Sequence, residues 1–88
     1  MKPKEGFLLR EVDGTNLVVA VGRASLEFSG MITLNRVGAF LWKCLEKDPT
    51  EEALVAQVLA HYEVDEVRAR TDVAAFLQKA RDAGLLEG

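Results

Sequence analysis

The sequence predicts an α+β fold, in which a three-stranded antiparallel sheet is followed by three helices. The first 34 residues are rich in short apolar and β-branched runs, and the hairpin signal Asp13-Gly14 divides two of them. The later chain changes to helical periodicity three times, each time after a residue suited to an N-cap: Asn35, Thr50 and Asp65. This order predicts a sheet covered by a small helical bundle.

The first two strands form the predicted hairpin. Gly6–Val12 reads as one strand, and Asn16–Gly22 reads as its partner because it is rich in β-branched residues. Asp13 and Gly14 between them both tolerate the positive φ values of a two-residue turn. The preceding residues, Met1–Glu5, are expected to form a short frayed end.

The third strand is predicted over Glu27–Leu34, after a connection at Arg23–Leu26. Alternation along this strand gives it an apolar face and a mixed face. The apolar face carries Phe28, Ile32 and Leu34, and the other face carries Glu27, Ser29, Met31 and Thr33. Gly30 falls on the apolar face, where glycine marks a bulge or a close backbone approach.

The first helix is predicted to be the centre of the fold. It follows Asn35 and is apolar nearly all round, which is typical of a helix buried on more than one side. One face carries Val37, Leu41, Cys44 and Leu45, and Phe40 and Trp42 flank it. The preceding strands and the following helices are therefore expected to pack on this segment.

The two later helices each show one apolar stripe. After Thr50 the stripe comprises Leu54, Val55, Val58, Leu59 and Tyr62, and after Asp65 it comprises Ala69, Val73, Phe76, Leu77 and Ala80. The last helix is expected to end near Ala83, because Gly84 suits a left-handed C-terminal position. Beside its stripe lies a shoulder formed by Val67, Arg70, Ala74 and Arg81, which reads either as a solvated edge or as a shallow groove wall.

The length, net charge and cysteine content of the chain limit the classes of protein to which it can belong. The chain has 88 residues and is expected to form one domain, residues 1–88. Its net charge of −3 argues against general affinity for nucleic acid or anionic membranes. The one cysteine excludes an internal disulfide and favours a reducing, cytoplasmic setting. No apolar run is long enough for a membrane span, and no hydrophobic signal segment follows the first residues.

The residue types predict a binding module and no enzyme. His61 is the only histidine, so neither a His-rich metal site nor a Ser-His-Asp triad can be assembled. Cys44 lies in the most apolar helix and reads as a buried small hydrophobe. The glycines form no phosphate-binding loop, and we expect no cofactor and no metal.

Two blocks of residues resemble the PqqD-like family. The first is Ile32-Thr33-Leu34-Asn35 with Gly38-Ala39, Leu41-Trp42 and Leu45, which is similar to the family's "LN…GA..iW..L" signature. The second is Asp72-Val73 with Phe76-Leu77 and Gly84-Leu85-Leu86, which is similar to its "Dv..Fl…GLl" ending; the Val64-Asp65 step also fits. The resemblance spans Gly6 to Leu86.

This resemblance implies a winged helix-turn-helix-like domain that recognises ribosomally synthesised precursor peptides (a RiPP recognition element, or peptide chaperone, of natural product biosynthesis). The leader of the precursor would add as a strand to the third β-strand, in the cleft with the third helix. The domain would then present the peptide to a modifying enzyme, often a radical SAM (S-adenosylmethionine) enzyme. The expected site comprises Ser29, Gly30, Met31, Ile32 and Thr33 with Val67, Arg70, Ala74, Leu77 and Arg81.

Two other readings stay open at this point. A winged-helix DNA-binding protein would use Arg68, Arg70, Lys79 and Arg81 on the last helix, although nearby acidic residues offset these charges. A homodimer that pairs its third strands would also cover the free edge. Strand pairing between copies and peptide binding do not exclude each other.

Overall fold

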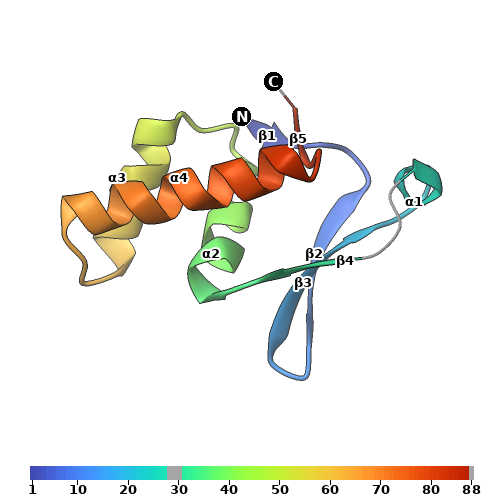
Figure 1. Ribbon diagram of the computed structural model, residues 1–88, viewed down its shortest axis with the longest axis horizontal. Helices are drawn as coiled ribbons and strands as arrows, with labels where there is room; N and C mark the ends of the chain where they lie inside the picture. Colours follow the sequence, from blue (N-terminus) through green and yellow to red (C-terminus); the bar gives the residue numbers. More distant parts are fainter. Residues whose placement is uncertain (28–30, 88) are drawn as a thin grey trace.

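A computed structural model describes residues 1–27 and 31–87 (Figure 1). Within this part, the elements in chain order are β1 (Lys2–Pro3), β2 (Phe7–Val12), β3 (Thr15–Ala20), α1 (Ala24–Glu27), β4 (Met31–Leu34), α2 (Arg36–Leu45), α3 (Glu51–His61), α4 (Glu66–Asp82) and β5 (Leu86–Glu87). The strands β2, β3 and β4 form an antiparallel sheet in that order, and β1 pairs with β5. The predicted α+β class, with three antiparallel strands before three longer helices, is confirmed.

The β2–β3 hairpin turns where the sequence predicts. Asp13 has φ +50° and Gly14 has φ +80°, and Val12 pairs with Thr15 across the turn. The register then places Leu9, Val18 and Ile32 in one row on the face toward the core. The neighbouring row belongs to the opposite face, which we call the outer face, and it comprises Leu8, Val19 and Met31.

The N-terminal segment differs from the prediction of a frayed end. Pro3 lies opposite Leu86 in the β1–β5 pair, and the Lys4 N–H donates to the Leu85 carbonyl at 2.8 Å. Both leucines are buried, Leu85 with 1% of its surface exposed. Burying this C-terminal tail brings its backbone beside the first residues, whose N–H and C=O groups then pair with it.

The third strand is shorter than predicted. Arg23–Leu26 was expected to be a connection, but Ala24–Glu27 forms the short helix α1, so Glu27 is helical rather than extended. Gly22, at φ +61°, reverses the chain here, and its carbonyl accepts a hydrogen bond from Ser25 Oγ at 2.6 Å. This turn chemistry overrides the strand pattern. The predicted strand residues 28–30 lie outside the described residues, and β4 comprises Met31–Leu34.

All three predicted N-caps are confirmed. Asn35 Oδ1 accepts from the Gly38 N–H at 2.7 Å, Thr50 Oγ1 from Ala53 at 3.1 Å, and Asp65 Oδ1 from Arg68 at 2.7 Å. At the other end of α4, Gly84 has φ +74°, the left-handed conformation predicted there. These caps fix where each helix begins, and therefore which side chains each helix turns toward the sheet.

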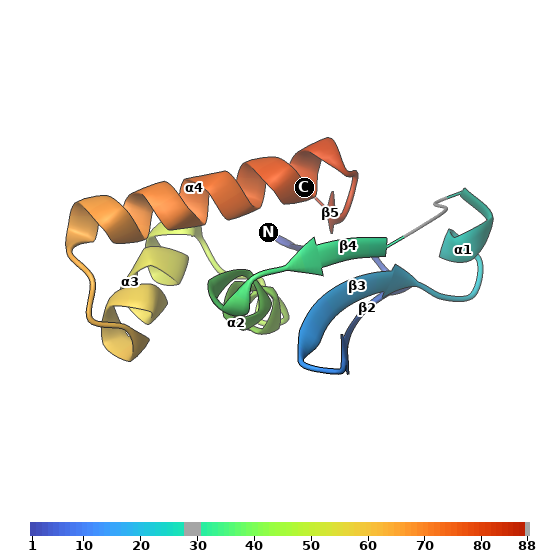
Figure 2. The same cartoon turned by 60° about the horizontal axis from the view of Figure 1, so that its bottom comes forward.

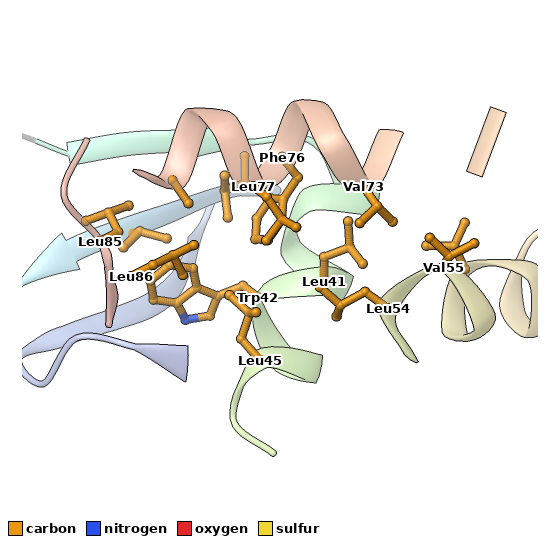
Figure 3. Close-up of a cluster of buried hydrophobic side chains, with 14 of the residues drawn as sticks. Leu41, Trp42, Leu45, Leu54, Val55, Val73, Phe76, Leu77, Leu85 and Leu86 are labelled. Carbon is orange, nitrogen blue, oxygen red and sulfur yellow. The ribbon is translucent and has the colours of Figure 1, made fainter. Parts of the chain in front are cut away.

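Helix α2 lies between α3 and the sheet in both views, while α4 runs along the molecule past all three (Figures 1 and 2). The α2 residues Leu41, Trp42 and Leu45 are buried among side chains from α3, α4 and β5 (Figure 3). This confirms the predicted central position of the helix. Leu59 departs from the predicted α3 stripe, since 39% of its surface is exposed.

Candidate functional site

Strand β4 is an edge of the sheet. One side of it pairs with β3, where Met31 lies opposite Val19 and Thr33 opposite Leu17. No described strand pairs with its other side. The side chains of Met31 and Thr33 are exposed, and Ile32 packs against the core. An edge of this kind offers unpaired backbone groups to a further strand.

A cleft of about 220 Å³ lies where β4 ends, α2 begins and α4 passes over both. Its walls combine apolar side chains with polar and charged ones. The lining residues are Leu34, Asn35, Val37, Gly38, Arg68, Asp72, Ala75, Phe76 and Lys79. The cleft therefore adjoins the end of β4. Figure 2 shows α4 running past this strand.

Gly38 lies where the beginning of α2 closely approaches the end of β4, and a side chain would have little room there. A β-carbon at this position would lie 3.2 Å from Asn35 Oδ1 and 3.4 Å from Leu34 Cβ. The Asn35 side chain cannot easily move away, because it caps α2 through the Gly38 N–H. The cap and the glycine together bring the start of α2 close to the end of β4.

The charges at the rim are partly paired. Arg68 Nε donates to both carboxylate oxygens of Asp72 at 3.1 Å, one helical turn along α4. Lys79 Nζ donates to the Thr33 carbonyl at 2.9 Å and thereby connects α4 to β4 across the mouth of the cleft. The side chain of Lys79 thus forms a hydrogen bond between α4 and the edge strand.

The residues predicted for the α4 wall, which include Val67 and Ala74, do not line this cleft. Leu77 is buried, with 1% exposed, and therefore belongs to the core. Arg70 pairs with Glu52 of α3 through two hydrogen bonds of 2.7 and 3.0 Å. Arg81 Nη2 lies 3.4 Å from the Met1 sulfur, on the N-terminal side. Of the predicted strand residues, Ser29 and Gly30 lie outside the described residues, and Met31, Ile32 and Thr33 are in β4.

Helical geometry explains the difference. At about 100° per residue, the buried stripe of α4 has a shoulder on each side. The shoulder toward β4 carries Arg68, Asp72, Ala75 and Lys79, and the opposite shoulder carries Val67, Arg70, Ala74 and Arg81. Periodicity finds the buried stripe but does not tell which shoulder the sheet lies against. The sequence reasoning selected the shoulder that faces away from β4.

The Arg70–Glu52 pair is a tie between α4 and α3. The hydrogen bonds and charge of Arg70 lower the pKa of the Glu52 carboxyl, and the same pair raises the pKa of the guanidinium. Glu66 lies 3.7 Å from the same arginine. With two carboxylates already beside it, Arg70 is not a free cation for an acidic ligand.

Two residues considered for chemistry occupy structural positions. His61 is exposed, with its ring centroid 4.6 Å from that of Phe40 and its Nδ1 3.1 Å from the Gln57 carbonyl oxygen. Cys44 is half-buried, and desolvation raises the pKa of its thiol. Among residues 1–27 and 31–87, no cluster of three or more His, Cys, Asp or Glu side chains could hold a metal ion. None of the helices in these ranges is long and apolar enough to cross a bilayer.

These features define a small α+β domain with an open strand edge beside a cleft of mixed polarity, an arrangement suited to pairing with an extended segment. The family model for coenzyme PQQ synthesis protein D (PqqD) matches residues 7–86. The chain therefore belongs to the PqqD family, as the sequence motifs indicated.

Two solved structures share the fold. One is TbiB1 in complex with the TbiA(beta) leader peptide, with a TM-score of 0.77 and 25% identity over 100% of this chain and 96% of that one. The other is lasso peptide synthetase B1 complexed with the leader peptide, with a TM-score of 0.75 and 15% identity over 99% and 96% of the two chains. The comparison with curated proteins finds no match.

Proposed function

We propose that this protein binds the leader region of a ribosomally synthesised precursor peptide, which adds as a strand to β4 beside α4. The observation that carries the proposal is the β4 edge, which no described strand pairs with, bordering the cleft beside α4. The family membership supports it, as does the 25% identical relative TbiB1, whose structure is a complex with a leader peptide.

The backbone at Thr33 would form part of the pairing. Its carbonyl already accepts from Lys79 of α4, so we infer that it points away from β3. Backbone N–H and C=O groups of one strand residue point to the same side, so the Thr33 N–H would also face the added strand. Main-chain hydrogen bonds would give affinity, and alternate peptide side chains would enter the cleft between Leu34, Ala75 and Phe76.

The domain would do no chemistry itself. It would hold the precursor for a modifying enzyme, and a radical SAM enzyme is the partner that the family resemblance suggests. A homodimer through β4 would use the same edge and would therefore compete with the peptide. We place this function in the cytoplasm, where the thiol of Cys44 would stay reduced.

The DNA-binding alternative is less well supported by the geometry of α4. Three of its basic side chains have partners within the protein: Arg68 with Asp72, Arg70 with Glu52, and Lys79 with the Thr33 carbonyl. Phosphate contacts would have to replace these bonds. We expect no retardation of duplex DNA at moderate salt, whereas micromolar, salt-sensitive retardation would favour this alternative.

The test begins with a display library of random 16-residue peptides, panned on the intact protein. The enriched sequence is synthesised and is called here the selected peptide. Thr33→Pro removes the N–H at the edge, so the affinity for this peptide should fall at least tenfold while the circular dichroism stays native. Thr33→Val keeps the N–H and serves as the control, with affinity within about twofold of the parent. Equal affinities for both variants would exclude pairing at this edge.

A further inference from the structure

We propose that Lys79 determines the charge preference of the peptide site: it covers the β4 edge in the free protein, and in the complex it pairs with a carboxylate of the peptide. This inference rests on the proposed function. It names the residue that selects the peptide and the chemical class of side chain that it selects, an Asp or a Glu.

The position of Lys79 supports the first half of this role. It lies on the shoulder of α4 that lines the cleft, and its Nζ donates to the Thr33 carbonyl at 2.9 Å. The two residues are 46 positions apart in the chain, so this bond depends on how α4 lies against β4. Covering a strand edge with another element is also a common means of discouraging unwanted strand pairing.

The charges around the cleft support the second half. Arg68, the other cation of the cleft, is neutralised by Asp72. Asp82, one turn beyond Lys79, accepts from Gln78 Nε2 at 2.8 Å. Among the described residues, no carboxylate oxygen lies within the ion-pair distance of Lys79, which has a neutral carbonyl as its partner. The ammonium is thus the uncompensated charge of the cleft rim.

Addition of a strand would change the partner of this lysine. An N–H of the incoming peptide would take over the Thr33 carbonyl, which leaves the ammonium above the added strand on the side facing α4. A peptide side chain on that same side could then reach it. An ammonium pairs with a carboxylate without the strict planar geometry that arginine requires, so either Asp or Glu would serve.

Two opposite effects follow for Lys79→Met, which keeps much of the aliphatic length and removes the charge. A neutral peptide would no longer have to displace the ammonium from Thr33, so it should bind equally well or more tightly. An acidic peptide would lose its ion pair and bind about fivefold more weakly, the effect of roughly 1 kcal/mol. A residue that only stabilised the fold would shift both peptides in the same direction.

The experiment pans the random 16-residue library separately on the parent protein, Lys79→Met, Lys79→Glu and the control Lys43→Met. Lys43 is an exposed lysine of α2 that does not line the cleft. The parent and the control should enrich Asp or Glu at one fixed position, Lys79→Met should lose this preference, and Lys79→Glu should enrich Lys or Arg there. Calorimetry with synthetic Glu and Gln versions of the selected peptide then gives the fold-changes.

The outcomes separate this inference from the proposed function. If the selected peptide is lost with Thr33→Pro but its charge preference is the same in all Lys79 variants, the role of Lys79 is wrong and the proposed function stands. If the parent enriches no peptide, or a peptide that Thr33→Pro still binds, both are overturned. If Lys79→Glu enriches Lys or Arg where the parent enriches Asp or Glu, and the control keeps the parent's preference, the inference is supported directly.

Discussion

Trp42 is the largest side chain of the central helix, and 3% of its surface is exposed. Its ring lies among the buried side chains of the core (Figure 3). We expect Trp42→Ala to lower the free energy of unfolding by about 3 kcal/mol, because it removes the buried surface and leaves a cavity. Urea denaturation measures this, and a loss below about 1 kcal/mol would show that the indole is not packed as described.

The stability that Glu52 contributes through its ion pair with Arg70 should depend on pH. The hydrogen bonds and charge of Arg70 lower the pKa of the Glu52 carboxyl below its usual value of 4.5, so the folded state favours the charged form. The stabilisation is therefore present above pH 4.5 and is lost as the pH falls through the lowered folded value. Glu52→Gln should be less stable than the parent at neutral pH, and the difference should shrink as the pH falls through the lowered pKa of the folded state. A difference independent of pH would contradict the pairing.

At the scale of elements, the N-caps and the hairpin turn were predictable because their signals are local. The side chains of Asn35, Thr50 and Asp65 each accept from a backbone N–H three residues later, so both partners of each bond lie in one short segment of the sequence. The β1–β5 pair was not predictable, since Pro3 and Leu86 come from opposite ends of the chain. Helix α1 was missed because Glu27 continues the alternation of the strand that follows.

The C-terminal tail is held against the core by a buried side chain and by pairing with the first residues. Leu85 is buried, with 1% exposed, and its backbone bonds to Lys4. If the tail is an integral part of the core, Leu85→Ala should cost about 3 kcal/mol of unfolding free energy, near the middle of the range for buried leucines. Chemical denaturation checks this. A cost of a few tenths of a kcal/mol would mean that the C-terminal tail is loosely attached.

At the scale of the whole molecule, the sequence predicted the fold class and the edge position of the third strand. The α4 shoulder that it proposed for the peptide does not line the cleft beside this strand. The stripe of α4 was correct, and Ala69, Val73 and Ala80 are buried. Both shoulders beside it combine an alanine with charged side chains, so neither composition nor periodicity separates them. The path of the chain from β4 through α2 and α3 determines which shoulder meets the strand.

The whole molecule also has an apolar surface apart from the cleft. Leu8, Val12, Val21 and Met31 are all exposed, and the register places Leu8 and Met31 on the outer face of the sheet. A peptide strand added beside β4 would extend this face, because its outward side chains would continue the row that ends at Met31. The outer face would then join protein and peptide in one surface.

The proposed function places the peptide between β4 and the α4 shoulder that faces it. Substitutions at the adjacent exposed residues Ala74 and Ala75 distinguish the two shoulders, because Ala75 lines the cleft and Ala74 lies on the opposite shoulder. Arginine suits an exposed helix position, so neither substitution should unfold the protein. Calorimetry with the selected peptide should show at least tenfold weaker binding for Ala75→Arg, and binding within about twofold of the parent for Ala74→Arg. Loss of binding in Ala74→Arg with normal binding in Ala75→Arg would contradict the account and place the peptide on the other side of the helix.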